Sequence, residues 1–144
     1  MMQHFFANAQ APANDLCANA IALPTGTCNG VVYNMRSATY TAASGAVACT
    51  GTDLYDAWFT FTATTINPTF TISGVGGAFN TPRMQILRGT CGSFTTVATC
   101  NTFPYTPTTL TTGETYYLRV YSTSGGVPNS IANGAYSICI TNPA

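Results

Sequence analysis

Short runs of alternating apolar and polar residues recur along this 144-residue chain and constrain its fold more than any other feature. In Glu114–Ser122, for example, Tyr116, Leu118 and Val120 occupy every second position. A period of two residues is typical of a strand that buries one face and leaves the other open. The other predicted strands are Thr27–Tyr33, Ala38–Ala42, Asp56–Thr64, Thr69–Ser73, Arg83–Arg88, Phe94–Thr99, Thr108–Leu110 and Gly134–Thr141. Turn signals recur about every 8–15 residues, which favours an all-β sandwich or barrel.

The chain is nearly uncharged. Its formal net charge is zero, only 6% of its residues are charged, and all four cationic residues are arginines. Nucleic-acid binding is disfavoured, because so few cations cannot neutralise a run of phosphates. The same deficit weakens the repulsion that keeps monomers apart, which favours self-association.

Six cysteines form an even set without a C-x-x-C motif: Cys17, Cys28, Cys49, Cys91, Cys100 and Cys139. A structural metal site would need closer cysteine pairs with histidine partners, and His4 is the one histidine of the chain. We therefore predict three disulfides, an oxidising compartment and a secreted, extracellular or cell-surface location.

The disulfide pairing is less constrained, because six cysteines allow 15 connectivities. The segment between Cys91 and Cys100 looks like two short extended arms around a turn, so we predict the pair Cys91–Cys100 first. Cys17–Cys28 is the second predicted pair, and Cys49–Cys139 follows by elimination.

The N-terminal segment is apolar but too short to span a membrane, since a membrane helix needs about 18 or more apolar residues. We predict a boundary here: residues 1–13 form an arm, and residues 14–144 form a single domain. Three readings of the arm stay open. It is the remnant of a secretion leader, a segment added with the expression vector, or an assembly arm that adds a strand to a neighbouring copy, with Phe5 and Phe6 filling pockets.

Five segments in a fixed order carry a resemblance to a known family: Asn14–Cys28, Asp53–Ala63, Met84–Asn101, Leu110–Tyr121 and Gly134–Thr141. Together they resemble the bacterial pre-peptidase C-terminal-like (PPC-like) domain, in a Cys-rich form similar to modules of secreted Bacteroidota proteins. The resemblance implies a jelly-roll-like sandwich without catalytic residues. With the strand pattern, we expect an all-β, jelly-roll-like antiparallel β-sandwich of about 8–9 strands, stapled by disulfides.

The residues for catalysis are scarce. A nucleophile needs a positioned histidine, and His4 lies in the N-terminal arm. The acidic residues are Asp15, Asp53, Asp56 and Glu114. We interpret Asp53 and Asp56 as turn-forming residues: one caps the turn before the strand, and the other accepts hydrogen bonds from loop amides. The alternative is a calcium site formed by Asp15, Asp53 and Asp56 with loop carbonyls; no other cofactor is expected. We therefore predict that the chain is not an enzyme.

Aromatic side chains are the best candidates for ligand contact. Trp58 is predicted to pack in the core, with a sugar-stacking platform as the alternative. Tyr117 and Tyr121 share the face opposite Leu118 and are predicted to be exposed and to contact a ligand. The four arginines, Arg36, Arg83, Arg88 and Arg119, are interpreted as cross-strand surface partners.

Two functions follow from these patterns. The first is a non-enzymatic extracellular structural module that assembles with itself into a surface fibre or layer, favoured by the neutral surface and the apolar arm. The alternative is a carbohydrate-binding or adhesion accessory module of a secreted protein, with a polysaccharide as partner.

Overall fold

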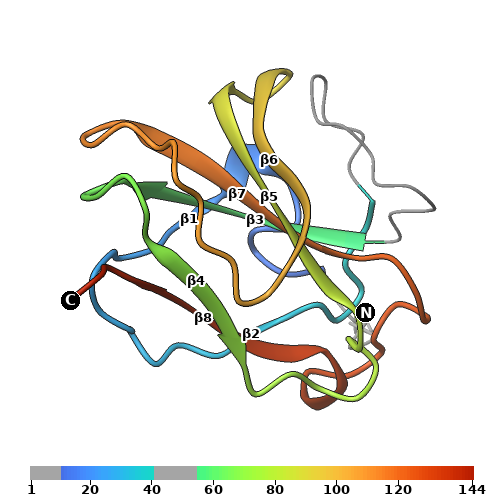
Figure 1. The fold of residues 1–144 in the computed structure, drawn as a ribbon. Coiled ribbons are helices and arrows are strands. Elements are labelled where there is room, and N and C mark those ends of the chain that lie inside the picture. Colours follow the sequence, from blue (N-terminus) through green and yellow to red (C-terminus); the bar gives the residue numbers. More distant parts are fainter. Residues whose placement is uncertain (1–10, 41–54) are drawn as a thin grey trace, which may run out of the picture.

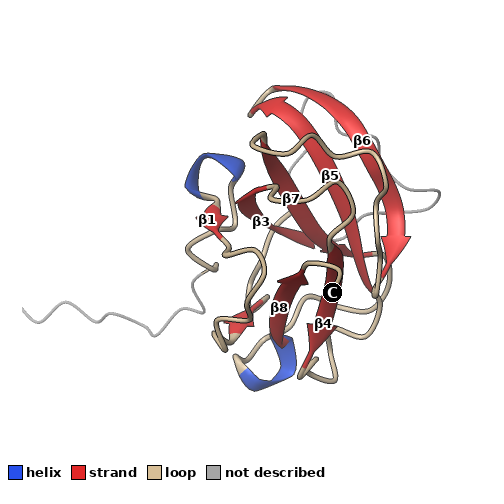
Figure 2. Cartoon of the chain, turned by 60° about the vertical axis from the view of Figure 1, so that its left-hand side comes forward, coloured by secondary structure: helices blue, strands red, loops and turns tan. Residues whose placement is uncertain are grey.

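The computed structural model describes residues 11–40 and 55–144, and these form a two-layered β-sandwich (Figures 1 and 2). The larger sheet has the strand order β1-β3-β7-β5-β6 and the smaller sheet the order β2-β8-β4. All neighbouring strands are antiparallel except β1 and β3, which are parallel. The elements are η1 (Cys17–Asn19), β1 (Ile21–Ala22), β2 (Tyr33–Asn34), β3 (Tyr55–Thr62), β4 (Thr69–Ser73), β5 (Pro82–Thr90), β6 (Ser93–Thr102), β7 (Thr115–Ser122), η2 (Ala132–Gly134) and β8 (Ala135–Thr141). The predicted all-β sandwich is confirmed.

The strands with clear alternation are confirmed, and the weak ones are not. β3, β4, β5, β6, β7 and β8 each overlap a predicted run. Within Thr27–Tyr33 only Tyr33 belongs to a strand, and Thr108–Leu110 is a loop. In Ala38–Ala42, residues 38–40 form no strand and the last two lie outside the described residues. Short polar runs lack the apolar face whose burial fixes a strand.

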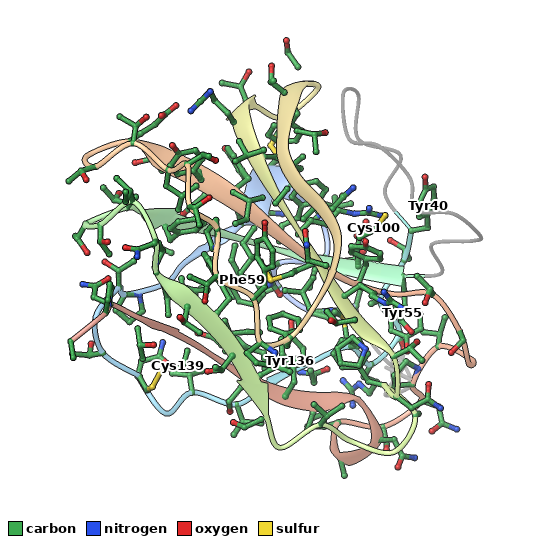
Figure 3. The ribbon with its side chains drawn as sticks, viewed as in Figure 1. Tyr40, Tyr55, Phe59, Cys100, Tyr136 and Cys139 are labelled. Carbon is green, nitrogen blue, oxygen red and sulfur yellow. A yellow bond between two sulfur atoms is a disulfide. The ribbon has the colours of Figure 1, made fainter. Side chains whose placement is uncertain are left out.

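The core fills the space between the two sheets. Phe59 on β3 lies opposite Leu118 on β7, and both side chains are fully buried. Phe61 and Tyr116 form the next pair on the same face and are also buried. Tyr136 on β8 faces them from the smaller sheet (Figure 3), with its ring centroid 6.3 Å from that of Phe59. Burial raises the pKa of the Tyr136 phenol, so this side chain is neutral at any physiological pH. The alternation read from the sequence therefore identifies the inner face correctly.

The outer face of the larger sheet is covered, contrary to our expectation of an open face. Trp58, at 0% exposure, stacks on Phe94 with a centroid distance of 5.6 Å and packs with Cys17 of η1. The Trp58 backbone N–H donates to the Asn14 carbonyl oxygen at 2.9 Å, which attaches the segment around Asn14 to the edge of β3. η1 and β1 lie beside β3 in Figure 2. The prediction that Trp58 is a core residue is confirmed.

Two disulfides join the segment before β2, which contains Cys17 and Cys28, to the two sheets. Cys17 in η1 bonds to Cys91 in the β5–β6 turn, and Cys28 bonds to Cys139 on β8. The predicted pairs Cys91–Cys100, Cys17–Cys28 and Cys49–Cys139 are therefore wrong. Cys100 is itself disulfide-bonded, and Cys49 lies outside the described residues.

The geometry of the β5–β6 hairpin explains the error for Cys91–Cys100. The turn lies at Cys91 and Gly92, ahead of the segment that we took for two arms. From Ser93 to Cys100 the chain runs along one strand, β6, in which each residue rises about 3.3 Å, so Cys100 lies far from the turn that holds Cys91. A disulfide needs Cα atoms about 4.4–6.8 Å apart. The Cα atoms of Cys17 and Cys91 meet this requirement, at a distance of 5.9 Å.

Candidate functional site

The outer face of the larger sheet contains a buried ion pair. The Arg119 Nε donates to Asp56 Oδ2 at 2.8 Å, and its Nη1 donates to Gln85 Oε1 at 2.9 Å. The Arg119 and Asp56 side chains are 2% and 0% exposed. Register explains the contact, because Arg119 lies beside Gln85 of β5 on one side and beside Trp58 of β3 on the other.

Two sequence interpretations are corrected at this pair. Arg119 is a buried partner rather than a surface one, and Asp56 lies within β3 rather than capping the turn before it. Arg88 on β5 does form the predicted surface pair, because its Nε donates to Glu114 Oε1 at 2.6 Å with both side chains partly exposed. The sequence could not distinguish the two arginines, since both alternate with apolar residues on strands.

Tyr117 and Tyr121 do not form an exposed aromatic platform. Tyr121 is 0% exposed, and the Arg119 guanidinium lies 4.7 Å from its ring centroid. Tyr117 is half-buried and packs edge-on against Trp58 and Phe94. The predicted exposure of Tyr121 is wrong, and a fully buried ring offers no face on which a sugar can stack.

The predicted calcium ligands have other contacts. Both carboxylate oxygens of Asp15 accept hydrogen bonds from Thr39, one from its N–H and one from its hydroxyl, each at 2.7 Å. Asp56 binds Arg119, and Asp53 lies outside the described residues, as do His4, Phe5 and Phe6. Across residues 11–40 and 55–144, no three His, Cys, Asp or Glu side chains form a metal-ligand group. Calcium at Asp15, Asp53 and Asp56 stays a prediction.

A groove of about 320 Å³ lies where the two sheets meet at one end of the sandwich. It is formed by the end of β4, the loop that leads into β5, the first residues of β5 and the end of β6 (Figure 1). This volume is at the lower end of the range of about 300–1,000 Å³ for small-molecule sites. The lining residues are Ile72, Asn80, Thr81, Pro82, Arg83, Thr102 and Phe103.

The groove combines apolar and polar walls. Ile72 and Phe103 are partly buried and pack against the core, so they are held in place from below. Thr81 is fixed by its hydroxyl, which lies 3.0 Å from the hydroxyls of both Ser122 and Ser124. Asn80 is exposed. A few polar groups around an apolar surface are the usual composition of a small-molecule site.

Sequence reasoning missed this groove. Of its lining residues only Arg83 was singled out, and it was taken for a surface partner. Ile72, Asn80 and Phe103 come from three separate segments, and the Phe70–Tyr105 bridge joins β4 to the segment after β6. Phe103, an aromatic residue in a loop just after a strand and before Pro104, was the one available signal.

A family model described as "Galactose binding domain-like", of the kind associated with the type IX secretion system (T9SS), matches residues 13–133. The match spans more than half of the chain and includes the whole groove. The chain belongs to this galactose-binding-domain-like family. A β-sandwich is the fold of such domains, in agreement with the two sheets described above.

Membership of the galactose-binding-like family refines the sequence interpretation. It supports a Cys-rich module of secreted Bacteroidota proteins, but it does not extend to the PPC-like family. The T9SS association indicates a secreted or cell-surface protein. Galactose-binding-like domains are typically non-catalytic accessory modules.

No curated protein and no solved structure matches the chain. In the part of the chain that the structure describes, no helix has the length and apolar character needed to cross a membrane.

Proposed function

We propose that this galactose-binding-like domain is a non-catalytic, carbohydrate-binding accessory module of a secreted protein, and that the groove between β4, β5 and β6 is its sugar site. The observation that carries the proposal is the composition of the groove: one aromatic ring, an apolar floor and several hydroxyl and amide groups. The family to which the chain belongs gives the sugar class to test first, galactose and its polymers.

The apolar side of the groove suits the face of a hexose ring. Sugar rings have an apolar face of C–H groups and a polar edge of hydroxyls, and aromatic rings pack against such faces. Phe103 provides the ring, and Ile72 and Pro82 extend the apolar surface beside it. Because Phe103 also contacts the core, little of its rotamer freedom remains to be lost on binding.

The polar side of the groove suits the hydroxyl edge. Asn80 provides an amide that can donate and accept, and Thr81 and Thr102 provide hydroxyls. Asn80 is exposed in the unbound groove, so its hydrogen bonds to a sugar would replace bonds to water. Each exchange contributes little net energy, which predicts weak binding to a single sugar and stronger binding to a polymer that is engaged repeatedly.

The proposal is tested by titrating the protein with galactose and with galactan oligosaccharides and following amide NMR shifts. Shifts are expected at residues 72, 80–83 and 102–103. The substitution Asn80→Ala should weaken binding about three- to tenfold, because a hydrogen-bonding partner in the site is lost. Phe103→Ala should abolish detectable binding, but it also removes a side chain that packs against the core. Asn80→Ala leaves the core intact and therefore tests the site alone.

Asn19→Ala is the matched control, since Asn19 is an exposed asparagine in η1, outside the groove. It should bind like the unmodified protein. A glycan array, run with and without a chelator, extends the search and also tests the calcium prediction. Absence of binding to every galactose-containing glycan, or shifts confined to residues outside the groove, would contradict the proposal.

Self-assembly into a fibre or layer is the second candidate, and the near absence of charge on the chain favours it. The predicted arm, residues 1–13, lies outside the described residues over positions 1–10. We expect removal of residues 1–11 to reduce the assembled fraction in size-exclusion chromatography and electron microscopy. Unchanged assembly would exclude strand addition by the arm.

A further inference from the structure

We infer that the groove selects acidic saccharides, and that Arg83 recognises their anionic substituent, a carboxylate or a sulfate. The inference rests on the proposed sugar site and adds the chemical class of its ligand. Arg83 is the one charged residue among those that line the groove. An arginine in a binding site favours planar, two-pronged contact with a carboxylate or a sulfate oxygen pair.

Arg83 differs from the two arginines whose charge is already matched. Arg88 is bound by Glu114, and Arg119 is bound by Asp56. Within residues 11–40 and 55–144, Arg83 has no such acidic partner; its Nη1 reaches only the Cys100 carbonyl oxygen, at 3.5 Å. A bond of that length is weak, so an anionic ligand can displace it at small cost.

The sheet register places a second donor beside Arg83. Arg83 on β5 lies directly opposite Thr102 on β6, and residues opposite one another in an antiparallel pair project from the same face. Both residues line the groove. Arg83 and Thr102 thus lie at one wall, and Phe103 follows Thr102 in the chain. This arrangement suits a sugar that carries its acid group at the edge of the sugar ring.

Among the described residues that line the groove, no carboxylate opposes an anion. Among the lining residues none is Asp or Glu, and Asn80, Thr81 and Thr102 are neutral hydrogen-bonding groups. The local charge of the described groove is therefore positive in a chain whose formal net charge is zero. Such a site attracts an anionic sugar by a short-range interaction that salt screens only in part.

The experiment compares three probes that share one ring: galactose, galacturonic acid and galactose 6-sulfate. Calorimetric or NMR titrations at constant ionic strength should give about three- to tenfold tighter binding of the acidic probe over galactose, as expected for one exposed charge-assisted hydrogen bond pair. The carboxylate and sulfate arms show which anion the site prefers. Arg83→Gln should remove the preference, measured as the ratio of the affinity for the acidic probe to the affinity for galactose in the same variant, and Arg83→Lys should retain part of it.

Arg88→Gln is the control, because it removes a guanidinium from the same strand outside the groove. It should preserve the preference for the acidic probe. Equal affinity for galactose and both acidic probes, or an undiminished preference in Arg83→Gln, would overturn the inference and leave the proposed sugar site standing. Absence of binding by all three probes and by galactan oligosaccharides would instead reject the sugar site itself.

Discussion

Replacing Asp56 by alanine is expected to lower the free energy of unfolding by about 3–5 kcal/mol, because it leaves the Arg119 charge buried without its carboxylate. Asp56 and Arg119 are almost fully buried at a contact distance of 2.8 Å, and the Arg119 guanidinium lies against the rings of Trp58, Tyr121 and Tyr40. The Gln85 oxygen bonds Nη1 and cannot replace a charge. Urea unfolding followed by the emission of Trp58, the sole tryptophan, measures the loss directly.

Two further variants distinguish a charge effect from a packing effect. The double replacement Asp56→Leu with Arg119→Met should recover much of the stability, since it removes both charges and retains volume. Glu114→Gln is the exposed counterpart: hydrogen bonds from Arg88 and Tyr116 lower the pKa of Glu114, but solvent screens the pair. This control should leave the urea midpoint nearly unchanged. A similar loss for Glu114→Gln and Asp56→Ala would show that burial does not govern the effect.

Removing the Cys28–Cys139 disulfide is expected to cost about 2–5 kcal/mol, since it closes a long loop in the unfolded chain. The two cysteines are 111 residues apart, against 74 for Cys17–Cys91. The double replacement Cys28→Ala with Cys139→Ala tests this by urea unfolding at constant temperature. An unchanged midpoint would contradict the expected role of the bond.

The two disulfides should differ in what their loss exposes. Cys17 packs against Trp58, whereas Cys28 and Cys139 lie at the smaller sheet, far from Trp58 in the fold. Figure 3 places Cys139 at the opposite side of the molecule from Tyr40 and Cys100. Replacing Cys17 and Cys91 by alanine should therefore shift the Trp58 emission to longer wavelength under native conditions. The Cys28–Cys139 variant serves as the matched control and should keep the native emission.

The inner face of each long strand was predictable from sequence, and the outer face was not. Tyr116, Leu118 and Val120 alternate, and alternation identifies which residues share a face. It does not reveal whether another segment covers the opposite face. Tyr117, Arg119 and Tyr121 are amphipathic residues that suit water or a partly polar interior, so the extent of their burial could not be read from their types.

Long-range pairing limited the prediction of the disulfides and of the site. The correct partners of Cys17 and Cys28 lie far along the chain, whereas local spacing favoured Cys91–Cys100. The groove likewise depends on which strands pair, since Ile72 lies on β4 of the smaller sheet and Phe103 directly follows β6 of the larger sheet. A single sequence gives strand positions through periodicity, but strand order requires knowledge of contacts between distant residues.

The position of β8 has a consequence for how the chain matures. β8 is the central strand of the smaller sheet, and it is also the last strand in the sequence. Until it is available, β2 and β4 have no neighbour within that sheet, and Cys28 has no partner. Strand pairing over such long sequence distances is slow compared with local contacts. Completion of the sandwich thus awaits β8, and a chain that lacks this strand would expose Phe59 and Phe70 to solvent and to other chains.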